Sequence, residues 1–162
     1  FEFFYAPTEE FHQQIRQEMA RYSSDWEELL GQGAAGFGTM LQKMSPLVAH
    51  VTLLTYTEAY SVVASMLARK EANESLEQAD CISDALTYGR QAYLQRRISS
   101  ESSIGKLLFK NGYQMLKSRN LTEGGKESLK EERLELAREL RELLRRIDLI
   151  RAVGVANRSS SP

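Results

Sequence analysis

The stretch SPLVAHVTLLTYTEAYSVVASMLARK, residues 45–70, is the most apolar run of the chain and decides its fold class. A membrane-spanning helix needs about 20 predominantly apolar residues, and a carboxylate near its centre costs several kcal/mol. This run contains His50 and Glu58 and is diluted by threonine and serine. Its apolar side chains cover most of the helix circumference, as expected for a helix surrounded by others. We therefore predict a central core helix, begun by Ser45 and Pro46 as cap and first residue.

The composition is that of an ordinary globular domain. The chain has 162 residues, 21 basic and 22 acidic side chains, and a net charge of -1. Because positive and negative charges nearly cancel, the domain as a whole lacks the positive field that nucleic-acid binding needs. With Cys81 as the single cysteine and only His12 and His50 as histidines, no disulfide or zinc-ligand set is predicted. We expect one domain with no nucleic-acid partner, metal or cofactor, and Cys81 as a small core residue.

Apolar periodicity predicts an all-α bundle of about five helices with a short N-terminal extended arm. The arm, residues 1–6, is aromatic and suits a strand of a neighbouring domain. Residues 7–153 form the helical domain, and residues 154–162 have no period and are expected to be a disordered tail. Asn120 is predicted to end one helix in the left-handed conformation. The helical patterns cover residues 11–30, 45–69, 76–97, 99–120 and 129–150.

The glycine-rich segment GQGAAGFG, residues 31–38, interrupts the first helical pattern. A phosphate-binding loop of this kind joins a strand to a helix and carries a Lys followed by Ser or Thr at a fixed place. Neither feature is present, so a flexible connector is the favoured interpretation.

The last predicted helix, residues 129–150, carries a stripe of leucine and isoleucine in which Arg133 fills a gap. The stripe spans only about three heptads, which favours packing on the chain's own helices over a coiled coil with another chain. Glu142 and Arg146 have the spacing of an i,i+4 ion pair. Exposed arginines of this helix could also meet acidic lipid headgroups: Arg138, Arg141, Arg145, Arg146 and Arg151.

A polar stripe runs along the central helix through His50, Thr57, Glu58 and Ser61. At 100° per residue, Thr57 and Ser61 lie about 20° on either side of His50, and Glu58 about 80° away. Buried polar groups need hydrogen-bond partners, so the stripe either faces other helices in a satisfied network or lines a cleft or domain interface. Glu58 is about 12 Å from His50 along the axis, too far to orient it as a general base. No catalytic residue is predicted.

The chain resembles the C-terminal helical region of bacterial, membrane-associated glycerol-3-phosphate acyltransferases. The opening FFYAPTEEFHQQI resembles the strand and helix that leave the catalytic domain of that family. The segments that carry the resemblance are MSPLVAHVTLL (44–54), EAYSVVASMLA (58–68), C.......GRQ..LQRRI (81–98), SSESS....LF (99–109) and RNL (119–121).

This resemblance implies acyl transfer from acyl-CoA or acyl carrier protein to glycerol 3-phosphate, the first step of phospholipid synthesis. The catalytic mark of the family is H-x-x-x-x-D, in which the Asp orients a proton-accepting His. Here His12 is followed five residues later by Gln17, and His50 by Thr55.

The resemblance therefore implies that the catalytic domain precedes Phe1 in the same polypeptide and that this chain is inactive alone. The chain would support that domain, with the polar stripe as a candidate contact to it. A peripheral place on the cytoplasmic side of the membrane, without a transmembrane helix in this chain, is also implied. The alternative is an independent helical protein-interaction module.

Overall fold

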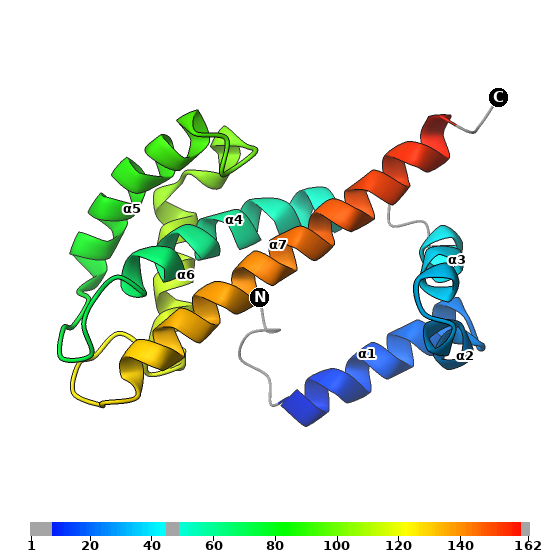
Figure 1. Ribbon diagram of the computed structural model, residues 1–162, viewed down its shortest axis with the longest axis horizontal. Helices are drawn as coiled ribbons and strands as arrows, with labels where there is room; N and C mark the ends of the chain where they lie inside the picture. The colour runs from blue at the N-terminus through cyan, green and yellow to red at the C-terminus, as the bar shows by residue number, and fades with distance from the viewer. Residues whose placement is uncertain (1–7, 45–48, 160–162) are drawn as a thin grey trace. The chain divides into compact units, whose positions relative to one another are not determined.

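The structure, a computed structural model, describes residues 8–44 and 49–159. The predicted all-α class is confirmed, because these residues form seven α-helices and no strand. The extended arm and the Ser45–Pro46 helix start lie outside the described residues. The elements are α1 (Thr8–Tyr22), α2 (Trp26–Gly31), α3 (Ala34–Met44), α4 (Ala49–Leu67), α5 (Gln78–Leu94), the short 3-10 helix η2 (Glu101–Ser103), α6 (Lys106–Ser118) and α7 (Leu129–Ser159) (Figure 1).

The chain divides into two compact units. The first comprises residues 1–50 and 148–162, and the second comprises residues 51–147. The second unit therefore contains most of α4, all of α5, η2 and α6, and the first part of α7.

The core of the second unit forms around α4, as predicted for the apolar run. Helix α6 approaches α4 closely at Gly112, where a Cβ atom would lie 3.3 Å from Tyr60 and from Val63. Helices α5 and α6 meet at Gly89, where a Cβ would lie 3.1 Å from Phe109. The fully buried apolar side chains of this core include Ala59, Val63, Leu67, Ala85, Phe109, Met115 and Leu116.

Cys81 belongs to the same core and is fully buried, which confirms the prediction of a small core residue. Burial, with a smaller contribution from the charge of Asp84, raises the pKa of the thiol to about 12. The thiol therefore stays protonated and unreactive at neutral pH.

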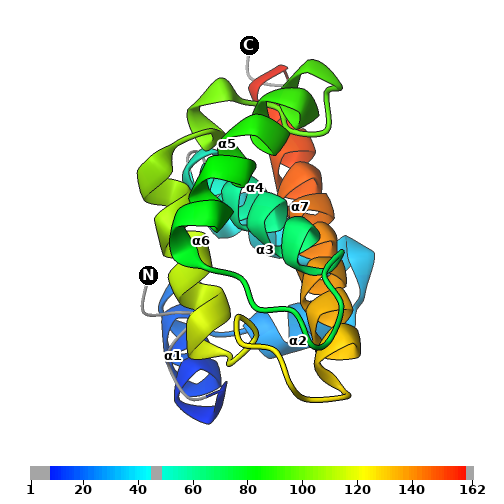
Figure 2. The same ribbon diagram turned by 90° about the vertical axis from the view of Figure 1, so that its left-hand side faces the viewer.

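Two loops at one end of this unit, residues 68–77 and 119–128, lie side by side, green and yellow in Figures 1 and 2. The Leu76 N–H donates to the Thr122 carbonyl at 2.8 Å, and the Gly125 N–H donates to the Ala72 carbonyl at 3.0 Å. Gly124 allows this approach, because a Cβ there would lie 2.4 Å from the Asn73 carbonyl oxygen.

Arg133 of α7 joins these loops from inside the core. Its side chain is 1% exposed. It donates to three backbone carbonyls, those of Leu121 at 3.0 Å, Glu71 at 2.7 Å and Glu74 at 2.8 Å. Burial lowers the pKa of the guanidinium. The gap in the leucine stripe is thus filled by a cation that serves as a hydrogen-bond donor for the loops.

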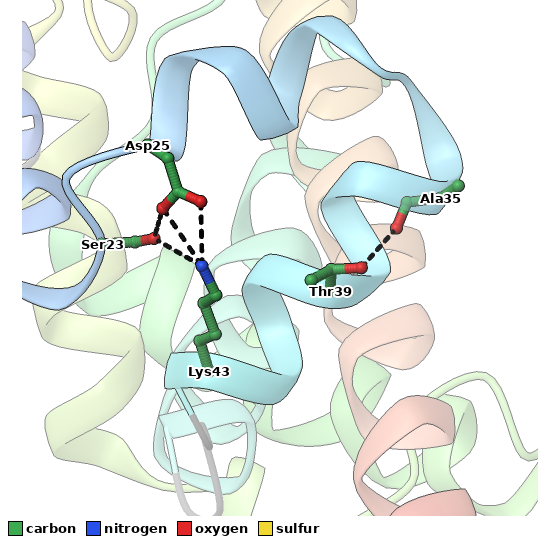
Figure 3. Close-up of polar contacts among 5 residues, drawn as sticks. All are labelled: Ser23, Asp25, Ala35, Thr39 and Lys43. Carbon is green, nitrogen blue, oxygen red and sulfur yellow. Dashed lines mark hydrogen bonds and ion pairs between the residues drawn. The ribbon is translucent and has the colours of Figure 1, made fainter.

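In the first unit, the helical pattern over residues 11–30 is divided into two helices, α1 and α2. The short link between them is held by Lys43 of α3 (Figure 3). Lys43 donates to both Asp25 oxygens, at 3.1 and 3.0 Å, and to the Ser23 hydroxyl at 3.3 Å. The Ser23 hydroxyl also donates to Asp25. These contacts, that from Ser23 first, lower the pKa of Asp25.

The flexible connector predicted for residues 31–38 is wrong for most of that segment. Gly33, with φ of +69°, separates α2 from α3, but α3 begins at Ala34 and includes Gly36 and Gly38. A Cβ on Gly36 would lie 1.8 Å from the Leu29 carbonyl oxygen. The glycine therefore permits close contact between α2 and α3. Helix α3 and the division of the pattern over residues 11–30 into α1 and α2 raise the number of α-helices among the described residues from the predicted five to seven.

Helix α7 continues to Ser159, beyond residue 153, where the helical region was expected to end. The predicted pair of Glu142 and Arg146 is confirmed at 3.2 Å. Arg145 also contacts Glu142, at 2.9 Å. Hydrogen bonds from Arg145 and then Arg146 lower the pKa of Glu142 to about 2.

Candidate functional site

A half-open groove of about 290 Å³ lies among α4, α5 and α7 in the second unit. Its polar lining comes from Glu58, Ser61 and Ser65 of α4, Tyr88 of α5, Arg97 from the turn after α5, and Arg141 of α7. Val62, Ala92, Ile98 and Leu144 line the rest of it.

A larger hollow of about 440 Å³ follows the surface of α7 and is lined, among the described residues, by that helix alone. Ion pairs occupy its wall: Arg138 lies 3.0 Å from Glu135, and Arg146 lies 3.2 Å from Glu142. One helix cannot enclose a ligand, so the groove among α4, α5 and α7 is the better candidate site.

Glu58 lines the groove and is only 3% exposed. Its Oε1 accepts the Ser99 N–H at 2.6 Å and the Ser99 hydroxyl at 2.8 Å. Its Oε2 accepts the Ser103 hydroxyl at 2.5 Å, and Ser103 is fully buried. Charge-assisted bonds of this kind are roughly twice as strong as neutral ones. Both oxygens of the carboxylate are therefore engaged by the chain itself.

The partners of Glu58 come from the SSESS segment, residues 99–103, where a single helix over residues 99–120 was predicted. Ser100 instead caps η2, its hydroxyl accepting the Ser102 N–H at 3.2 Å. Helix α6 then begins separately at Lys106. The break leaves Ser99 and Ser103 free to turn toward α4, which a continuous helix would not allow.

The turn that ends α5 places Arg97 beside the groove. The Arg97 N–H donates to the Ala92 carbonyl at 2.8 Å, and the Arg96 N–H donates to the Tyr93 carbonyl at 2.9 Å. These two bonds form a Schellman motif with Arg96 in the left-handed position, at φ of 55°. A left-handed non-glycine residue costs roughly 1 kcal/mol or more.

Two arginines gather at Tyr88. Arg97 and Arg69 both donate to its hydroxyl, at 3.0 and 3.2 Å. Their guanidinium carbons lie 5.2 and 4.8 Å from the ring centroid, within the range of cation–π contact. Arg141 adds a third cation nearby in the groove, with its Nε donating to the Ala137 carbonyl of its own helix at 3.1 Å.

The structure separates the four residues of the predicted polar stripe. Thr57 is buried and donates to the Leu53 carbonyl of α4 at 2.7 Å. Ser61 is half-buried and lines the groove with Glu58. His50 is buried near the start of α4 and belongs to the first unit. Of the four residues, only Glu58 and Ser61 line the groove. The site also includes Ser99, Arg97 and Arg141, which the polar stripe of α4 did not predict.

Among residues 8–44 and 49–159, no group of three or more His, Cys, Asp or Glu side chains could hold a metal ion. No helix in the part of the chain that the structure describes is long and apolar enough to cross a membrane.

The fold and the groove define a class of protein: an all-α domain in which a buried carboxylate holds a loop beside a groove. Two arginines line that groove and form no ion pair with a carboxylate among the described residues. Residues 1–124 match the family described as the glycerol-3-phosphate acyltransferase C-terminal region. The chain belongs to this family, which confirms the family expected from the sequence.

The putative acyltransferase plsB1 of Mycobacterium bovis is 28% identical over 151 residues, which is 93% of this chain. The same figures hold for plsB1 of two Mycobacterium tuberculosis strains. The chain spans about a quarter of these relatives, 24% of their length. No solved structure matches the chain.

Proposed function

We propose that this chain is the C-terminal helical part of a glycerol-3-phosphate 1-O-acyltransferase. In this reaction the first hydroxyl of glycerol 3-phosphate attacks the thioester carbonyl of acyl-CoA or acyl carrier protein. A C–O bond forms, the C–S bond breaks, and the thiol leaves with a proton. The match of residues 1–124 to the C-terminal region of this family is the observation that carries the proposal.

The role of the chain is to support a catalytic domain that lies upstream in the same polypeptide. The acid–base pair H-x-x-x-x-D does not occur in the chain. Glu58 is also unsuited to accept a proton from a substrate, because both of its oxygens accept hydrogen bonds from serines of the chain. The chain alone is therefore inactive.

The complete protein would lie peripherally on the cytoplasmic side of the membrane. The structure gives little support to the arginines of α7 as its lipid contact. Most are paired within the helix, Arg138 with Glu131 and Glu135, Arg145 and Arg146 with Glu142, and Arg151 with Asp148. Paired charges of this kind leave little net field to attract anionic lipid.

The test is acyl transfer by the full-length protein and by the 162-residue chain, with labelled glycerol 3-phosphate and either acyl-CoA or acyl carrier protein as donor. We expect the full-length protein to form 1-acylglycerol 3-phosphate with at least one donor and the chain alone to form none. Absence of product from the full-length protein with both donors, or product from the chain alone, would overturn the proposal.

A further inference from the structure

We propose that the groove among α4, α5 and α7 binds a phosphate group through Arg97 and Arg141. This goes beyond acyl transfer and does not depend on it, because binding requires neither an acyl donor nor a catalytic domain. The ligand class is a phosphate monoester or inorganic phosphate.

The cations of the groove supply the first argument. Arg97, Arg141 and the neighbouring Arg69 form no ion pair with a carboxylate among the residues that the structure describes. This contrasts with the next arginines along α7, which all pair with acidic side chains. Arg69 and Arg97 even share one neutral acceptor, the Tyr88 hydroxyl. Neighbouring cations that form no ion pair with a carboxylate favour an anion between or beside them.

The geometry of the guanidinium groups supplies the second argument. The Nε of Arg141 is used by the Ala137 carbonyl, and Arg97 uses one NH group on Tyr88. Each guanidinium has five N–H donors, so each retains donors for a ligand. A planar fork of N–H groups matches two phosphate oxygens, which is why arginine is common at phosphate sites.

The remaining lining fits a small polar ligand. Ser61 and Ser65, half-buried on α4, add two hydroxyl groups that can donate to phosphate oxygens. The volume of about 290 Å³ is at the low end of the range for ligand sites. It accommodates a phosphate group with a few further atoms and leaves larger portions of a ligand outside.

Glu58 is the one acidic residue of the lining and would repel an anion if its charge faced the groove. Its two oxygens instead accept three hydrogen bonds from Ser99 and Ser103. These dipoles offset its charge, and Arg97 and Arg141 leave the lining with a positive balance. Glu58 is thus a positioning residue, because it holds the segment that follows Arg97.

The test is a nuclear magnetic resonance titration of the chain with inorganic phosphate and with glycerol 3-phosphate, at low salt. We expect saturable shifts at the groove with a Kd on the order of 1 mM. Arg97→Gln and Arg141→Gln should each weaken binding at least tenfold. Arg138→Gln is the matched control, an exposed arginine of α7 already paired with Glu135, and should bind as the wild type does. Unchanged amide spectra away from the groove show that each variant is folded.

A second arm distinguishes a free phosphate from a lipid headgroup. The same variants are sedimented with vesicles of phosphatidylcholine containing phosphatidic acid, and with phosphatidylcholine alone. Binding to phosphatidic acid vesicles that needs Arg97 and Arg141 identifies a headgroup phosphate, and binding of the soluble anions alone identifies a free one. The proposal is overturned if neither probe binds, or if Arg138→Gln weakens binding as much as Arg97→Gln does.

Discussion

Glu58 and Ser99, 41 residues apart in the sequence, share two hydrogen bonds, from the N–H and from the hydroxyl of Ser99 to the same carboxylate oxygen. A third bond from Ser103 engages the other oxygen. The carboxylate therefore fastens the connection between α5 and α6 onto α4. This connection carries Arg97. The position of Arg97 in the groove therefore depends on the contact between Glu58 and Ser99.

Removing this carboxylate should destabilise the second unit strongly. Glu58→Ala deletes the acceptor and leaves the Ser99 N–H and the buried Ser103 hydroxyl without their partner. We expect the free energy of unfolding to fall by about 3 kcal/mol, and by less in Glu58→Gln, whose amide oxygen still accepts. Chemical denaturation monitored by circular dichroism measures this. Glu135→Ala, at an exposed ion pair, should change it by less than about 1 kcal/mol. If Glu58→Ala and Glu135→Ala lower the free energy of unfolding by the same amount, Glu58 does not anchor the segment as described.

Arg133 should be intolerant of replacement, although it occupies a position of an apolar stripe. Arg133→Met fills a similar volume but leaves the carbonyls of Leu121, Glu71 and Glu74 without their donor. Stability should fall by about 3 kcal/mol, because three backbone carbonyls, that of Leu121 buried and those of Glu71 and Glu74 part-buried, lose a charged partner. Hydrogen exchange of the two loops should accelerate in the same variant. Exchange in these loops that matches the wild type would contradict the role assigned to Arg133.

Gly36 and Gly38 offer a matched pair on one helix. Gly36→Ala places a Cβ against the Leu29 carbonyl and should destabilise the contact of α2 with α3 by about 2 kcal/mol or more. A Cβ on Gly38 meets nothing within 4 Å. Gly38→Ala should therefore stabilise α3 by up to about 1 kcal/mol through helix propensity. Thermal unfolding of the two variants measures these effects as shifts in the melting temperature. Shifts of the same sign in both variants would be inconsistent with the structure.

Cys81 should resist thiol reagents until the protein unfolds. With its pKa raised to about 12, only about one thiol in 10⁴ is ionised at pH 8, against about one in ten for an ordinary cysteine. The free energy of unfolding should also fall as pH rises from about 9 toward 12, because only the unfolded thiol ionises there. Reaction with a disulfide reagent, with and without denaturant, measures the first effect. Rapid labelling of the native protein would show that the thiol is accessible.

The general fold could be predicted from local pattern. The apolar run of α4 gave the core helix, the Leu/Ile stripe gave α7, and Asn120 has the predicted left-handed conformation, at φ of 56°. The helical nature of residues 34–38 could not be predicted in the same way. Glycine disfavours a helix locally, and the reason for Gly36 is a close contact with the Leu29 carbonyl, which depends on tertiary structure.

The site could be predicted only in part, for a similar reason. Periodicity placed Glu58 on a polar face, but its partners Ser99 and Ser103 come from a segment that looked like a helix start. Arg141 was expected only as an exposed arginine of the last helix, and no pattern singled out Arg97 as a site residue. The packing of α4, α5 and α7 brings the two arginines to the same groove. The spacing of residues along one helix cannot predict that packing.

The central claim for this site is that the Glu58 carboxylate acts through the serines of residues 99–103. The most direct measurement is a double-mutant cycle of Glu58→Ala and Ser103→Ala, with the free energy of unfolding determined for the wild type and all three variants. We predict that the two substitutions are not additive, with a coupling of at least about 1 kcal/mol, because each removes the hydrogen bond between Glu58 and Ser103. Additive effects, with a coupling below about 0.3 kcal/mol, would show that the two residues act independently and would contradict it.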